Sequence, residues 1–133
     1  MKVLLDTHTW AWALSNNTVR LSARAVELIR GAEIVFVSPI SIFEIGQKVH
    51  RGKWPEMSPF LGQLADLLAQ QGARFAALTP EVCLQAAMLP WENRDPFDRL
   101  LAATAIMGGL TYISVDDAFD QLNAFDGWIG RRW

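Results

Sequence analysis

Three short runs rich in apolar and β-branched residues constrain the fold most: Val3–Leu5, Ile34–Val37 and Leu110–Val115. Segments with helical patterns lie between them. A strand that is apolar on both faces needs cover on both sides, and this is typical of parallel sheets whose connecting helices pack on the two faces. The alternation therefore predicts an α/β fold with a central, mainly parallel sheet.

Capping residues, prolines and glycines mark the helices between these strands. Ser22 is placed to cap one helix and Thr79 to cap another, while glycines follow several of the helical patterns. A weaker strand is expected from Phe75 to Leu78. The helices are expected from Thr7 to Leu14, from Ser22 to Gly31, from Pro39 to Gly52, from Leu61 to Gly72, from Thr79 to Pro90, and from Phe97 to Met107.

Length and composition set the broad class. The 133 residues fit one domain spanning 1–133, and 51% hydrophobic residues supply a core. A net charge of -2 excludes a histone-like binder, so affinity for nucleic acid must come from a local patch or a bound cation. The single Cys83 excludes an internal disulfide and is expected in the core.

No membrane or export segment is expected. Asp6 interrupts the first apolar run far short of a signal peptide. The longest uncharged stretch, from Leu100 to Val115, is shorter than the roughly 20 residues that span a bilayer. We therefore expect a cytoplasmic protein without membrane contact.

Four acidic residues fall where strands end or where the next helix begins: Asp6, Glu44, Asp98 and Asp116. Ligands of open α/β sheets bind beyond the carboxyl ends of the strands, so the four can meet at one edge. Carboxylates gathered in this way repel each other unless hard cations such as Mg²⁺ or Mn²⁺ neutralise them. Metal ions held by carboxylates can activate water for phosphodiester hydrolysis without a nucleophilic side chain.

Each acidic residue also has an ordinary structural interpretation. Asp6 and Asp116 could cap the helices that follow them. Asp95 is favoured as a cap, with Asp98 reaching back to it as in a capping box. Glu44 could pair with Lys48 one turn later. The functional interpretation therefore depends on four acidic residues recurring at one edge.

Other features are less specific. Lys48, Arg51 and Lys53 form a basic cluster near Glu44 that could follow a phosphate backbone. His8 is interpreted as a structural residue. Six tryptophans are many for this length, so some could lie in a partner interface or simply in the core; the candidates are Trp10, Trp12 and Trp54.

The motifs around the four acidic residues resemble those of the PIN-domain family, and most closely the VapC-like toxins of bacterial toxin-antitoxin pairs. The matching segments are Leu4-Leu5-Asp6-Thr7-His8, Val37 to Ile45, Arg94 to Ala103, and Ser114-Val115-Asp116. They follow the family's order and span nearly the whole chain. The resemblance implies a three-layer α/β/α sandwich and a Mg²⁺- or Mn²⁺-dependent endoribonuclease.

The resemblance also assigns residues and partners. Asp6, Glu44, Asp98 and Asp116 match the family's acidic positions, and Thr7, Ser38 and Ser114 match flanking hydroxyl positions that are expected to hydrogen-bond to them. It implies an RNA substrate, a cognate antitoxin and a homodimer. Asp117 departs from the pattern, because related sequences often have Arg there; the position after Ser114-Val115 favours Asp116 as the ligand.

Two other classes are compatible with parts of this pattern. A receiver-like phosphoacceptor domain shares an acidic Mg²⁺ pocket, but it needs paired acidic residues after the first strand and a late lysine, whereas Thr7-His8 follow Asp6 and no lysine follows Lys53. A non-catalytic module that keeps the metal cluster for stability or partner docking also stays open, since intact ligands do not establish turnover.

Overall fold

Five strands form the central sheet of the computed structural model, which describes residues 1–133. All neighbouring strands pair in parallel, in the order β3-β2-β1-β4-β5. The first strand along the chain therefore lies in the middle of the sheet. The strands are β1 (Lys2–Leu5), β2 (Ile34–Val37), β3 (Arg74–Phe75), β4 (Thr111–Ile113) and β5 (Arg131–Arg132).

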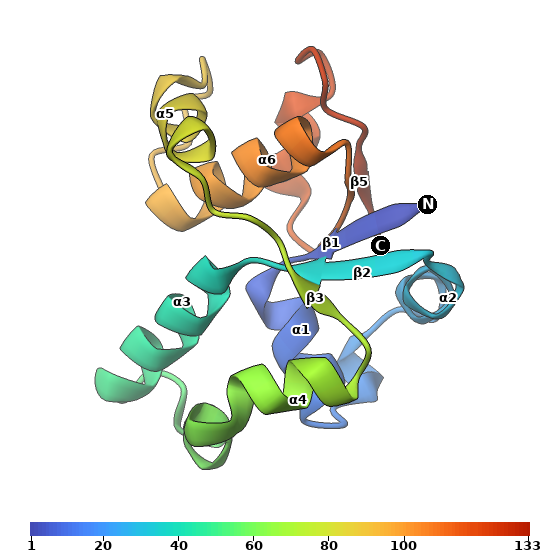
Figure 1. Cartoon of the computed structure of the whole chain (residues 1–133), viewed down its shortest axis with the longest axis vertical. Coiled ribbons are helices and arrows are strands. Elements are labelled where there is room, and N and C mark those ends of the chain that lie inside the picture. The colour runs from blue at the N-terminus through green and yellow to red at the C-terminus, as the bar shows by residue number, and fades with distance from the viewer.

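Helices cover both faces of the sheet (Figure 1). One face carries α5 and α6, and the opposite face carries α1, α3 and α4, with α2 beside the end of β2. The predicted three-layer α/β/α fold is confirmed. The helices are α1 (Thr7–Leu14), α2 (Ala23–Gly31), α3 (Pro39–His50), α4 (Leu64–Gln70), α5 (Pro80–Met88) and α6 (Pro96–Gly108), and the 3-10 helices are η1 (Thr18–Arg20), η2 (Pro55–Gln63) and η3 (Asp117–Leu122).

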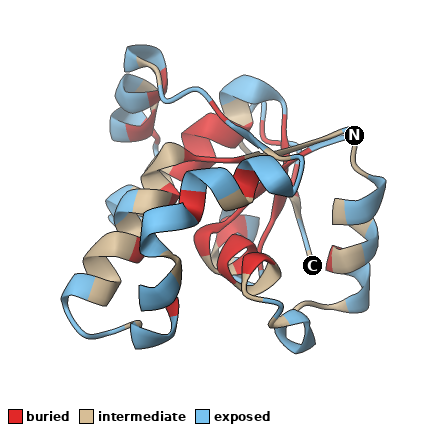
Figure 2. Cartoon of the chain, turned by 60° about the horizontal axis from the view of Figure 1, so that its bottom comes forward, coloured by how far each residue is buried: buried red, intermediate tan, exposed pale blue.

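Strand β1 shows why both faces need cover. Successive side chains of a strand point to opposite faces, so Leu4 enters one buried cluster while Val3 and Leu5 enter the other. In β4, Tyr112 and Ile113 divide between the two clusters in the same way. Figure 2 shows the buried residues concentrated on the sheet and on the inner surfaces of the helices.

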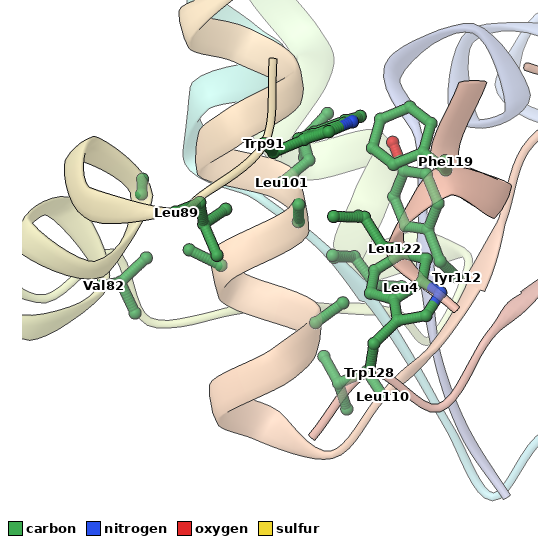
Figure 3. Close-up of a cluster of buried hydrophobic side chains, with 14 of the residues drawn as sticks. Leu4, Val82, Leu89, Trp91, Leu101, Leu110, Tyr112, Phe119, Leu122 and Trp128 are labelled. Atoms are coloured by element: carbon green, nitrogen blue, oxygen red, sulfur yellow. The ribbon is translucent and has the colours of Figure 1, made fainter. Parts of the chain in front are cut away.

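Aromatic rings fill much of the cluster beneath α6 (Figure 3). The rings of Tyr112 and Phe119 lie 4.4 Å apart, and Phe119 also contacts Trp91 and Trp128. Such tilted and stacked pairs stabilise a core beyond their buried area. This packing holds η3, and with it the chain just after β4, against the sheet.

Several sequence expectations need correction. Cys83 is exposed, because its neighbours Val82 and Ala86 occupy the buried face of α5 and Cys83 is rotated away from it. A strand was expected over 75–78, but β3 is Arg74–Phe75 and shares only Phe75 with that range. Strand β5 was not expected, because two-residue strands leave no pattern. The segment expected to be one helix from Leu61 begins as η2 and becomes α4 at Leu64.

Trp10 is buried in the core, as its ordinary interpretation predicted, whereas Trp12 and Trp54 are half-buried. No helix combines the length and the apolar character needed to cross a bilayer.

Candidate active site

The order of the strands places a crevice beside β1. Chain connections leave β1 toward β2 on one side, while β4 pairs with β1 on the other side. At such a reversal of strand order, the connections diverge and leave room beyond the carboxyl ends of the strands. Asp6 follows β1 directly, and Ser114 follows β4 directly, so both lie at this crevice.

Asp6 is buried and held by two donors. The backbone N–H of Thr9 donates to its Oδ1 at 2.7 Å, which makes Asp6 the N-cap of α1. The hydroxyl of Ser114 donates to its Oδ2, and the same hydroxyl accepts from the backbone N–H of Asp116 at 3.0 Å. The capping interpretation of Asp6 is therefore correct, and it fixes the carboxylate at the crevice.

Glu44 reaches the crevice from α3. The Thr7 hydroxyl donates to its Oε1 at 2.7 Å and lies 2.9 Å from the hydroxyl of Ser41. On the other oxygen, Lys48 forms an ion pair at 3.0 Å, as the spacing of one helical turn predicted. Glu44 is thus both an ion-pair partner and a member of the crevice, with 12% of its side chain exposed.

Asp98 projects from the first turn of α6. The Asn93 side-chain amide donates to its Oδ2 at 2.9 Å. The predicted capping box is wrong, because the backbone N–H of Asp95 donates to Asn93 instead of to Asp98. Asp95 does cap α6, accepting from Phe97 and Asp98.

Burial raises the pKa of Asp98 from 3.8 to about 6, with the charges of Asp95, Asp116 and Glu44 adding to the rise and the Asn93 hydrogen bond opposing it. Repulsion among carboxylates is thus present, as predicted from the sequence, but burial contributes more. Asp98 holds a proton more readily than an ordinary aspartate in the metal-free protein.

Asp116 is exposed and caps η3 by accepting from the backbone N–H of Ala118 at 2.9 Å. This matches its structural interpretation. Its neighbour Asp117 does not line the crevice, whereas Asp116 does. The structure therefore brings Asp116, and not Asp117, to the other acidic residues.

All four predicted acidic residues line one cleft of about 220 Å³, which we call the acidic cleft. Asp95 joins them, so five carboxylates face it and Lys48 is its one lysine or arginine. His8 lies at its wall, where burial and then the charge of Lys48 lower its pKa, against the effects of Asp6 and Glu44. The cleft therefore carries a large excess of negative charge.

Tyr112 lies at the floor of the acidic cleft, packed on Phe119 (Figure 3). Its hydroxyl is fully buried and has no hydrogen-bond partner. Burial and then the neighbouring carboxylates raise its pKa well above the ordinary value of 10.0, so the hydroxyl stays protonated and can donate. It is a donor in a site otherwise made of acceptors.

The donor set fits a hard divalent cation. Carboxylate oxygens are the ligands that Mg²⁺ prefers, and the acidic cleft leaves most of its negative charge uncompensated. No three acidic, histidine or cysteine side chains converge closely enough to form a complete cage. Mg²⁺ does not require such a cage, because it keeps several waters and binds through one or two carboxylates and substrate phosphates.

Some residues named from the sequence lie elsewhere. Ser38 is buried at the N-cap of α3, where it accepts from the backbone N–H of Ile40, and it does not line the acidic cleft. Arg51 is exposed and does not line the acidic cleft. Lys48 lines it. His8, interpreted as structural, stacks on Trp54 but also faces the acidic carboxylates.

Three supporting residues were not found from the sequence: Ser41, Asn93 and Tyr112. Ser41 lies one helical turn before Glu44, so the spacing could have placed both on one face of α3. Asn93, two residues before the capping Asp95, carries the pattern of an Asx turn. Nothing in the sequence marks Tyr112, whose position depends on which face of β4 lies beneath the cleft.

Comparison with known proteins agrees with this arrangement. Residues 3–124 match the PIN domain family. Ribonuclease VapC22 of Mycobacterium tuberculosis is 35% identical over 115 residues, which cover 86% of each chain. A crystal structure of VapBC2 from Rickettsia felis, bound to a DNA fragment from its promoter, has the same fold, with a TM-score of 0.68 and 16% identity over 100% of this chain and 99% of that one. The predicted resemblance is confirmed: the chain belongs to the PIN-domain family.

Proposed function

We propose that this protein is a metal-dependent endoribonuclease that hydrolyses RNA phosphodiester bonds and acts as the toxin of a toxin-antitoxin pair. The observation that carries the proposal is that Asp6, Glu44, Asp98 and Asp116 all line one cleft. The similarity to a protein named ribonuclease VapC22 over most of both chains supports the choice of RNA as substrate.

The acidic carboxylates would hold Mg²⁺ or Mn²⁺, and the ion would supply an activated water and stabilise the charge that develops on the phosphate. Ser114 orients Asp6, while Thr7 orients Glu44, so each carboxylate is held in a fixed orientation at the cleft. Lys48 forms an ion pair with the other oxygen of Glu44 at 3.0 Å. The Tyr112 hydroxyl is available to donate to an oxygen bound in the cleft.

A protein partner is also part of the proposal. The similarity in fold to a protein solved as a VapBC2 complex is consistent with a cognate antitoxin. Helix α5 exposes 67% of Leu84 and 73% of Met88, and a second copy of the chain would bury such apolar surface in a homodimer. We place the proposed activity in the cytoplasm.

The test combines a cleavage assay with calorimetry on the purified, antitoxin-free chain. Wild type should bind Mg²⁺ or Mn²⁺ and cut structured RNA only when the metal is present, and Asp98→Asn should lose both. Asp117→Asn is the matched control, because it removes the same charge just outside the acidic cleft. Equal metal binding by wild type and Asp98→Asn would contradict the assignment of the site.

A non-catalytic metal-binding or docking module is the second candidate. It is favoured by the structural roles of the acidic residues, since Asp6 and Asp116 cap helices and Glu44 forms an ion pair. Metal binding without cleavage of any RNA would support it. The receiver-like alternative is excluded by topology, because that class orders its strands 2-1-3-4-5 whereas this sheet is ordered β3-β2-β1-β4-β5.

A further inference from the structure

A second, larger cleft of about 420 Å³ lies beside the acidic cleft, and we call it the aromatic-basic cleft. It is walled by α1, by the end of α3 and by the chain that leads into η2. Its characteristic side chains are His8, Trp12, Arg20, Lys48, Lys53 and Trp54.

The two clefts adjoin each other, because His8 and Lys48 line both. Lys48 pairs with Glu44 on the acidic side at 3.0 Å, and its ammonium lies 5.5 Å from the ring centre of Trp54 on the other side. A chain that places one phosphate in the acidic cleft must continue beyond it. The aromatic-basic cleft is the neighbouring hollow that such a chain can enter.

The charge of the second cleft is opposite to that of the first. Arg20, Lys48 and Lys53 line it against the single carboxylate of Glu56. Neither Arg20 nor Lys53 forms an ion pair within the chain. In a protein of net charge -2, this local positive surface favours a polyanion over a neutral or basic ligand.

The aromatic rings provide stacking surfaces between these cations. His8 stacks on Trp54 with ring centres 4.6 Å apart and lies 5.7 Å from Trp12. The guanidinium of Arg20 lies 5.9 Å from the ring centre of Trp12. Both tryptophans are half-buried, so each presents part of its ring to the cleft. Proteins hold single-stranded nucleic acid with this combination of aromatic faces and backbone-tracking cations.

We infer that the aromatic-basic cleft binds the nucleotides that adjoin the cleaved bond in single-stranded RNA. Bases stack among Trp12 and Trp54, and the phosphates between them contact Arg20 and Lys53. The inference rests on the proposed ribonuclease function and names where its substrate extends. It also assigns the half-buried Trp12 and Trp54 a role in substrate binding.

Binding of labelled octamers of uridine and of adenosine tests the inference, with an abasic octamer of the same backbone charge as the comparison. All proteins carry Asp98→Asn, so that no probe is cut during the measurement. The parent should bind the base-containing octamers about 10-fold more tightly than the abasic one, as expected for stacking of one or two bases. Adding Trp12→Ala should remove that difference, and Trp12→Phe should restore most of it.

A charge variant supplies the second arm and does not depend on a half-buried ring. Arg20→Ala should weaken binding of all three octamers and reduce the slope of log affinity against log salt by about 0.7, the contribution of one phosphate contact on a single strand. Arg24→Ala is the matched control, because Arg24 is also exposed and lies outside both clefts. Thermal unfolding verifies that each variant is folded.

The outcomes separate the inference from the proposed function. If the parent binds base-containing and abasic octamers equally, or the Arg20 and Arg24 variants behave alike, the inference is overturned while metal-dependent cleavage by wild type can still stand. If Trp12→Ala leaves RNA binding unchanged but abolishes binding of the antitoxin, the cleft is a protein-docking surface and the inference is wrong. If wild type neither cleaves nor binds RNA, the proposed function itself fails.

Discussion

The two halves of the acidic cleft are built differently. Asp6 and Glu44, the buried half, are fixed by hydroxyls that are themselves buried, namely those of Ser114 and Thr7. Asp98 and Asp116, the open half, are supported by a side-chain amide and by a helix cap near solvent. The buried half is therefore held by buried side chains, whereas the open half is held by hydrogen bonds nearer the solvent.

Charge separates the halves as well. Lys48 compensates Glu44, while Asp98 has no cation near it and its pKa is raised to about 6. A partly buried carboxylate without a cationic partner lowers the stability of the metal-free protein, and binding of a cation removes this destabilisation. If the proposed metal binds here, the difference predicts that the buried half positions it, whereas the relief of charge repulsion comes mainly from the open half.

The largest effect is expected at Arg99, which holds the backbone of the segment that precedes α6 and carries Asn93. Its guanidinium donates to five backbone carbonyls, those of Ala86, Ala87, Leu89, Trp91 and Asn93, and so holds the loop that carries Asn93. Arg99→Ala should lower the free energy of unfolding by about 3 kcal/mol, because several charge-assisted hydrogen bonds are lost together. Urea unfolding measures this.

Arg99→Lys is the informative companion, since a lysine keeps the charge but cannot reach several carbonyls with one planar group. It should recover less than half of the loss. Full recovery would mean that charge, and not the shape of the guanidinium, holds this loop.

The second effect compares the two halves directly. Thr7→Val keeps the shape of the side chain but leaves Glu44 and Ser41 without their hydroxyl partner, so it should cost about 2 kcal/mol and weaken metal affinity roughly 10- to 100-fold. Asn93→Ala removes the donor to Asp98 in the open half and should affect metal affinity less. Calorimetry with Mn²⁺ on both variants ranks them, and a larger loss for Asn93→Ala would reverse the comparison.

The third effect is a gain in stability. Because the pKa of Asp98 is higher in the folded chain than in the unfolded chain, the folded state binds more protons between about pH 4 and pH 6, and stability falls as pH rises through that range. Asp98→Asn should therefore stabilise the metal-free protein above pH 6 by about 1 kcal/mol, which is below the full linkage value because solvent screens a partly exposed carboxyl.

Thermal unfolding in a chelator at pH 7.5 and at pH 4 measures this difference. The gain should disappear at the lower pH, where wild type is also protonated at Asp98. A variant that is less stable than wild type at both values would show that the carboxylate is not strained in the metal-free cleft.

The smallest effect is expected at Lys48. Its ion pair with Glu44 is partly exposed, so Lys48→Met should change the free energy of unfolding by about 0.5 kcal/mol or less. Removing the one cation of the acidic cleft should raise Mg²⁺ affinity by a few-fold while it weakens binding of RNA. A fall in both affinities would show that Lys48 organises Glu44 for the metal.

Local patterns in the sequence were sufficient for three of the five strands and for the acidic edge. The apolar runs marked β1, β2 and β4, and the caps at Ser22, Thr79 and Asp95 were each correct. These features depend on neighbours within a few residues, so a single sequence reveals them. The structural interpretations of Asp6, Glu44 and Asp116 were correct too. Each of these residues caps a helix or forms an ion pair and also lines the acidic cleft.

Features that depend on distant contacts could not be predicted. Asn93 takes the place of Asp98 in the predicted capping box. Arg99 holds the loop that carries Asn93, and the Asn93 side chain bonds to both the Asp95 backbone N–H and the Asp98 carboxylate. Cys83 is exposed because the packing of α5 on α6 selects Val82 and Ala86 for the buried face. Ser38 starts α3 at the cleft's margin but points into its own helix.

The sequence by itself determined the longer strands and helices and the presence of carboxylates near the strand ends, because periodicity and capping are local. Only the tertiary structure decided which supporting groups meet those carboxylates. Ser114 is 108 residues from Asp6 along the chain, and Thr7 is 37 residues from Glu44, yet parallel pairing of β1 with β2 and β4 places each pair in contact. No local pattern encodes the strand register across the sheet, and this register helps to bring four acidic residues that are distant in sequence to one cleft.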